Sequence, residues 1–185
     1  MKLFVLGKAW AFCLAFAGTS LALNHLRIDT TSGSVYGMIN GSHPNVAQFL
    51  GIPFAAPPVG NLRFAPPTTF APQAIIDATR QGPLCPQYLL NKSDSPSVYT
   101  YDTPWLQPAG PIDEDCLTLD IRVPVSNVAE NGTLPVLIWL FGGGFYEGGT
   151  RTLGMDASPW IQRTKSHIVV AIKLASLSFQ LPINC

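Results

Sequence analysis

Apolar and polar residues alternate near the start of the sequence in a way that is typical of β-strands. The alternation runs over residues 26–30 and again over 35–39, and the turn residues Ser32-Gly33-Ser34 separate the two runs. Two alternating runs joined by a short turn predict a β-hairpin. Residues 46–52 form a further short run, which predicts a third strand.

A fourth strand is predicted over residues 117–123. Apolar residues at 117, 119, 121 and 123 alternate with Thr118, Asp120 and Arg122. This period of two is the pattern of a strand that is buried on one face and solvated on the other. A turn through residues 127–132 follows.

The last regular region predicts two buried strands with a helix between them. Residues 136–141 are apolar on both faces and therefore require cover on both sides, as in a parallel sheet. Ser158-Pro159 predicts a short helix with serine as its cap and proline at its first position. Residues 168–172 form a second fully apolar strand. This strand–helix–strand order indicates an α/β fold.

The connections between these elements are unusually rich in proline. Eight prolines fall within residues 53–86, and proline removes a backbone donor and fixes φ. We therefore expect this stretch to wrap over the surface as extended segments and turns. Residues 87–113 are polar and predict a long loop.

Composition and charge exclude two broad classes of protein. Hydrophobic residues make up 47% of the 185 residues and charged residues 12%, which argues against a disordered chain. The formal net charge is +0, so no basic surplus is available for binding nucleic acid.

The N-terminus has the order of features expected of a secretory signal. Lys2 and Lys8 precede an apolar run over residues 9–17, and the small-x-small sequence Ser20-Leu21-Ala22 follows. The run is too short to span a bilayer. We therefore predict a signal peptide over residues 1–22, cleaved near Ala22, and a secreted protein. A buried N-terminal helix and an uncleaved anchor are the alternatives.

Secretion implies an oxidising compartment, in which cysteines form disulfides. Cys13 belongs to the predicted signal, so Cys85 and Cys116 are the natural pair, and Cys185 is left over. Three free buried thiols are the alternative. Possible N-glycosylation sequons begin at Asn40, Asn91 and Asn131.

A glycine-rich loop is the feature that carries candidate chemistry. Gly142-Gly143-Gly144 follows the apolar run 136–141 directly, and neither a Walker P-loop nor a dinucleotide-binding pattern fits its spelling. Backbone N–H groups of such a loop form an oxyanion hole in acyl-transfer enzymes. A glycine-rich turn without a ligand is the alternative.

Three blocks of sequence resemble the type-B carboxylesterase and lipase family. They are FLGIPFAAPPVGNLRF at 49–64, EDCLTLDI at 114–121 and LPVLIWLFGGGF at 134–145. The blocks occur in the family's order, and the resemblance covers residues 26–172. It implies an α/β-hydrolase fold, here incomplete, within a domain over residues 23–172.

The resemblance also implies a function and roles for six residues. The family cleaves carboxylic esters without a cofactor or metal. By resemblance, Gly143 and Gly144 are oxyanion donors, Cys85 pairs with Cys116, and Arg63 forms an ion pair with Glu114. The expected partner is a small-molecule or lipid carboxylic ester, and no nucleic acid is expected to bind. No transmembrane segment is expected in the chain.

The catalytic triad has no counterpart in these residues. No serine lies in a Gly-x-Ser-x-Gly sequence, and His25, His43 and His167 precede any position where the family carries its base. Residues 173–185 also depart from the family's pattern. Because the triad is absent, we expect the chain by itself to be inactive. We also expect it to be poorly soluble, because strand 136–141 lacks a neighbour. A non-catalytic adhesion-like member and a truncated or mis-spliced product without function are the alternatives.

Overall fold

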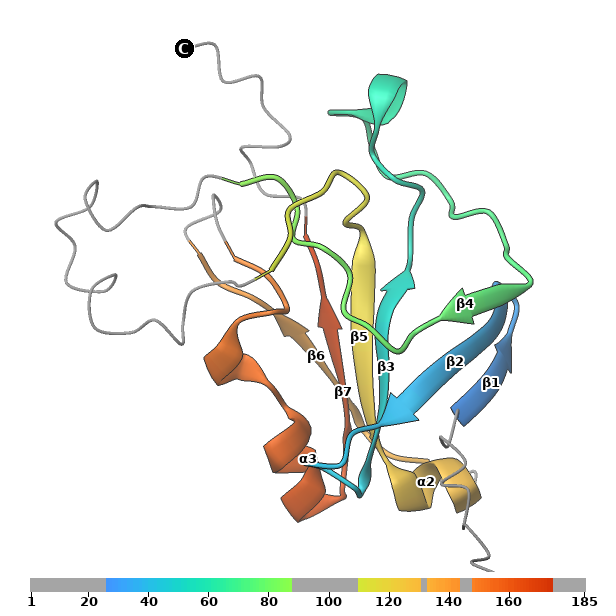
Figure 1. Ribbon diagram of the computed structural model, residues 1–185, viewed down its shortest axis with the longest axis vertical. Helices are drawn as coiled ribbons and strands as arrows, with labels where there is room; N and C mark the ends of the chain where they lie inside the picture. Colours follow the sequence, from blue (N-terminus) through green and yellow to red (C-terminus); the bar gives the residue numbers. More distant parts are fainter. Residues whose placement is uncertain (1–25, 88–109, 131–132, 144–147, 175–185) are drawn as a thin grey trace, which may run out of the picture.

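The computed structural model describes residues 26–87, 110–130, 133–143 and 148–174, and the predicted signal peptide lies outside these ranges. Within them a mixed sheet has seven strands. Its main path has the order β1-β2-β3-β5-β7-β6, and β4 pairs with β2. In Figure 1, β3, β5 and β7 stand side by side, with β1, β2 and β4 on one flank and α3 on the other.

The N-terminal hairpin is confirmed. β1 (Leu26–Thr30) and β2 (Gly33–Ile39) pair antiparallel, with Ile28 opposite Val35. β3 (Val46–Pro53) confirms the third predicted strand and pairs with both β2 and β5. Its first five residues are all buried, because both faces of the sheet are covered at this point.

The proline-rich stretch leaves the end of β3 and runs across to β4, as Figure 1 shows. It contains the short 3-10 helix η1 (Gly60–Leu62) and the three-residue strand β4 (Ile75–Asp77). β4 pairs parallel with β2 at the side of the sheet. A strand in this position pairs along one side, so it uses fewer of its backbone N–H groups. The predicted surface wrap is therefore confirmed, and the sequence pattern missed only this short strand.

Residues 117–123 were predicted to form a strand with one solvated face. The strand is confirmed, but the predicted solvent exposure of its polar residues is wrong. β5 (Thr118–Pro124) is covered on both faces, so Thr118, Asp120 and Arg122 are each at most 5% exposed. These polar residues are buried more deeply than Leu119 and Ile121 beside them. The polar face of β5 is therefore an internal surface and is not solvated.

Residues 125–130 form a helix where the sequence predicted a turn. α2 (Val125–Glu130) begins directly after β5, and Val125 and Val128 pack against the core cluster of β2, β3 and β4. The buried apolar contacts explain why this short segment is helical despite its weak sequence signal.

The strand–helix–strand unit is confirmed. β6 (Val136–Leu140) and β7 (Ile168–Ile172) pair in parallel, and α3 (Ser158–Thr164) connects them after the 3-10 helix η3 (Leu153–Met155). The predicted cap of α3 is wrong, because Ala157 occupies the cap position without a side-chain hydrogen bond. Ser158 lies inside the helix, and its Oγ donates to Asp156.

Among the described strands, β6 lies at the end of the sheet and pairs only with β7. Val136, Ile138 and Leu140 are 57%, 62% and 56% exposed, although the pattern predicted cover on both faces. β6 therefore presents exposed apolar side chains at the edge of the described sheet.

Candidate functional site

The candidate site begins where β6 ends. Leu140 lies opposite Ile172, the last residue of the parallel strand β7. The segments that follow β6 and β7 therefore leave the sheet at the same edge. Ligands of α/β sheets bind at the carboxyl ends of parallel strands. The glycine loop therefore starts at the edge of the sheet where the chemistry is expected.

Gly143 has a backbone conformation that suits a glycine. Its φ of 148° lies in a region that residues with a Cβ rarely adopt. Gly142 is not among the glycines with a positive φ, and a Cβ added there would meet no other atom within 4 Å. The second predicted oxyanion donor, Gly144, lies outside the described residues.

The loop returns to the fold at Gly148, which is held tightly. Gly148 has a φ of 129°, and a Cβ there would clash with the ring of Phe141 at the start of the loop. Its N–H donates to Oε1 of Gln87 at 2.7 Å, and its carbonyl accepts from Nε2 of Gln87 at 2.9 Å. Gly148 is therefore held in place by Gln87, close to the ring of Phe141 at the start of the loop.

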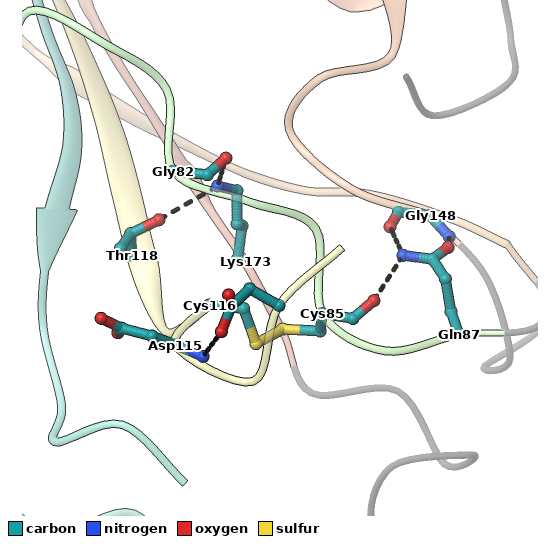
Figure 2. Close-up of a disulfide and its surroundings, with 9 residues drawn as sticks. Gly82, Cys85, Gln87, Asp115, Cys116, Thr118, Gly148 and Lys173 are labelled. Carbon is teal, nitrogen blue, oxygen red and sulfur yellow. Dashed lines mark hydrogen bonds between the residues drawn. A yellow bond between two sulfur atoms is a disulfide. The ribbon is translucent and has the colours of Figure 1, made fainter. Parts of the chain in front are cut away.

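Gln87 links this loop to the predicted disulfide. Its Nε2 also donates to the carbonyl of Cys85 at 3.1 Å, and Figure 2 shows the amide between Cys85 and Gly148. Cys85 is joined to Cys116 by a disulfide across 31 positions of sequence, and both cysteines are buried. Sequence reasoning missed Gln87, because a polar residue at the start of a loop has no recognisable pattern.

The predicted ion pair between Arg63 and Glu114 is present in the structure. Nη2 of Arg63 lies 2.8 Å from Oε1 of Glu114, and the two side chains are 48% and 32% exposed. One contact at this exposure contributes little to stability. Its main effect is to tie the proline-rich stretch to the segment that carries Cys116.

A buried polar cluster lies beneath the site and was not foreseen. Asp120 is fully buried, and its two carboxylate oxygens accept hydrogen bonds from the N–H of Gly51 at 2.8 Å and from Gln81 at 3.0 Å. Lys173 follows β7 directly, and its Nζ donates to the carbonyl of Gly82 at 2.6 Å and to Oγ1 of Thr118 at 3.1 Å.

The environment of Lys173 shifts its protonation. Burial lowers its pKa from 10.5 to about 8, and Asp120 opposes that effect while Arg151 adds to it. Desolvation disfavours the charged form of an amine, which is the physical reason for the direction.

The remaining predicted residues are apart from the loop or outside the described ranges. His43 lies in the turn before β3, and His167 lies just before β7, where its ring contacts that of Trp160 with centroids 4.1 Å apart. Asn40 is half-buried in a turn, where its Oδ1 accepts from the N–H of Ser42. His25, Asn91 and Asn131 lie outside the described residues. None of the described helices is long and apolar enough to cross a membrane.

Comparison with known proteins gives one consistent family. The model of the Carboxylesterase family matches residues 24–179. The chain is 40% identical to a chlorogenic acid esterase of Aspergillus niger over 85% of its own length and 30% of that protein. It is 38% identical to secreted lipase 5 of Gibberella zeae over 80% of the chain and 30% of that protein. Liver carboxylesterase 1F of Rattus norvegicus is 37% identical over 68% of the chain and 22% of that protein. The chain thus spans about a third or less of the length of these relatives.

Proposed function

Because the chain belongs to the carboxylesterase family, we propose that it supplies the oxyanion-binding side of the active site of an ester hydrolase. In this reaction a nucleophile attacks the acyl carbon of a carboxylic ester, and negative charge develops on the carbonyl oxygen. The N–H groups of Gly143 and Gly144 would donate hydrogen bonds to that oxygen. Fixed backbone donors stabilise such charge without reorganising during the reaction.

The conformation of Gly143 at the end of β6 is the observation that carries this proposal. Residues with a Cβ rarely adopt a φ of 148°, and Gly148, which follows the loop, is held by two hydrogen bonds to Gln87. A plain turn needs a glycine but does not need side-chain hydrogen bonds that hold the residue after the loop. This arrangement favours the enzyme lineage over a glycine turn without a ligand.

The nucleophile and base belong to residues outside this sequence in our proposal. The sequence contains no Gly-x-Ser-x-Gly, and we expect the 185-residue chain by itself to hydrolyse no ester. The relatives include proteins named for chlorogenic acid and for lipids, so the substrate class we propose is the carboxylic esters as a whole.

We also propose that the protein is secreted after cleavage near Ala22 and glycosylated at Asn40, Asn91 and Asn131. The relatives that are named secreted lipases support secretion, as does the Cys85–Cys116 disulfide. Residues 173–185 are proposed to form a tail that departs from the family's pattern.

A chimera tests the proposed function. Residues 24–172 would replace the matching segment of the Aspergillus niger chlorogenic acid esterase, and hydrolysis of p-nitrophenyl butyrate would be measured. We expect turnover by the chimera and none by the 185-residue chain. A chimera that has native-like circular dichroism and no turnover contradicts the proposal, as does turnover by the chain alone.

A further inference from the structure

Residues 81–87 lie beside residues 148–151, the segment that follows the glycine loop, and hydrogen bonds join the two segments. Nη1 of Arg151 donates to the carbonyl of Gln81 at 3.2 Å. Nε2 of Gln81 donates to the carbonyl of Thr150 at 3.3 Å. The first segment therefore supports the chain at the point where it leaves the glycine loop.

The side chain of Gln87 makes the last of these connections. Its Oε1 accepts from the N–H of Gly148, and its Nε2 donates to the carbonyls of Gly148 and Cys85, as Figure 2 shows. A primary amide has two N–H donors, so both donors of Gln87 are in use, and these partners fix which way the amide group faces. Cys85 is buried and joined to Cys116, so the connection starts from a covalently restrained residue.

Gly148 in turn lies against the start of the glycine loop. A Cβ added to Gly148 would clash with the ring of Phe141 and would lie 2.7 Å from the carbonyl oxygen of Gly142. That carbonyl belongs to the same peptide unit as the N–H of Gly143. A trans peptide is planar, with its C=O and N–H pointing in opposite directions, and the described chain has no cis peptide bond. The packing of Gly148 against the carbonyl of Gly142 therefore also sets the direction of the Gly143 N–H.

We propose that Gln87 is a positioning residue of the oxyanion hole, which fixes the direction of the Gly143 N–H through Gly148. This inference rests on the proposed ester hydrolysis and adds to it a residue outside the glycine loop. Without the amide of Gln87, Gly148 is free to shift, and the peptide between Gly142 and Gly143 is free to rotate. A misaligned donor stabilises the developing oxyanion less, whereas binding of the uncharged ester changes little.

Kinetics of the chimera that carries residues 24–172 test this role, with p-nitrophenyl butyrate as the substrate. Gln87→Met keeps the approximate size of the side chain and removes its amide. We expect kcat to fall about 10–10²-fold, with KM within a few-fold of the parent. Gln162→Met is the matched control and should leave both constants within a few-fold of the parent. Gln162 is also half-buried, and its Oε1 accepts from the N–H of Asn45 at 3.0 Å on α3, away from the glycine loop.

The order of the Gly143 amide gives an independent measurement on the 185-residue chain. NMR relaxation of the backbone amides should give a lower order parameter for Gly143 in Gln87→Met, and an unchanged one in Gln162→Met. If Gln87→Met fails to fold, Gln87→Glu replaces it, because glutamate keeps the acceptor for Gly148 and loses both donors. We expect Gln87→Glu to lower both kcat and the order parameter.

A folded Gln87 variant with the kcat of the parent chimera overturns the inference, as does a rise in KM without a fall in kcat. An unchanged order parameter for Gly143 also overturns it. Absence of turnover in a folded parent chimera contradicts the proposed function instead, and the order parameter then decides this inference.

Discussion

Asp120 and Arg122 show how single polar residues are made compatible with a buried strand. Asp120 is surrounded by donors from Gly51 and Gln81, and Nε of Arg122 lies 2.8 Å from Oδ1 of Asp156 and donates to Ser158. Each buried charge thus has hydrogen-bond partners, which is the condition for burying it. Lys173 has neutral hydrogen-bond partners, as Asp120 does, whereas Arg122 also forms an ion pair with Asp156.

Lys173 should make stability depend on pH in the alkaline range. Its pKa is about 8 in the folded chain and 10.5 as the ordinary value, so the unfolded chain binds more protons between these two pH values. Stability should therefore rise with pH from about 8 to 10.5, by on the order of 3 kcal/mol. Urea unfolding at pH 7.5 and pH 10.5 measures this rise.

The control for this effect is Lys173→Met, which has no titrating group at the position. We expect the rise in its unfolding free energy over the same range to be smaller than that of the unmodified chain by about the same amount. An identical rise in both proteins would show that other groups, and not Lys173, cause it.

At the scale of elements, the strands could be predicted from sequence and their surroundings could not. β1, β2, β3, β5, β6 and β7 follow from apolar patterns, because those patterns reflect the strand period directly, and only the three-residue β4 was missed among the described strands. The burial of Thr118, Asp120 and Arg122 depends on α3 and on residues 80–82, which are distant in sequence. α2 was missed for the same reason, since its stability comes from packing on the core cluster.

The residues of the site also differ in how far they could be predicted, according to whether their role depends on local sequence or on distant partners. The glycine loop was identified because its sequence context, directly after a buried strand, is local, and the family resemblance assigned the oxyanion role to Gly143. Gln87 and Lys173 act through partners 61 and 91 positions away, respectively, and no local pattern records such pairs. The family resemblance supplied Arg63 and Glu114, which residue patterns alone would not have joined.

The disulfide covalently links the proline-rich stretch to the segment before β5. Its removal should lower the free energy of unfolding. Cys85→Ala with Cys116→Ala frees a loop of 31 positions and leaves two small gaps beside Ala55 and Leu117. We expect the double variant to lose about 3–4 kcal/mol of unfolding free energy relative to the oxidised chain. Urea unfolding of the oxidised chain, the reduced chain and the variant gives this difference, and a loss below about 1 kcal/mol would contradict it.

For the whole molecule, we expect the exposed strand β6 to govern association in solution. β6 carries no charged residue, and four of its five apolar side chains are exposed. Unpaired backbone groups beside an apolar surface are a template for pairing with another chain. We therefore expect the isolated chain to associate as its concentration rises.

Ile138→Lys should reduce this association, because a charge on the edge strand opposes pairing. Ile75→Lys is the matched control, since Ile75 is 63% exposed on β4 and Ile138 is 62% exposed on β6. Light scattering across a concentration series should show more monomer for Ile138→Lys and little change for Ile75→Lys. Equal effects of the two variants would show that general solubility, and not the β6 edge, controls association.

The central claim is that Gly143 forms part of an oxyanion hole, and kcat in the chimera tests it most directly. Gly143→Ala introduces a Cβ at a φ of 148°, whereas Gly142→Ala places a Cβ in open space. We predict that Gly143→Ala lowers kcat for p-nitrophenyl butyrate by about 10²–10³-fold with little change in KM, and that Gly142→Ala stays within a few-fold of the parent chimera. Equal kcat values for the two variants would contradict the oxyanion role of Gly143.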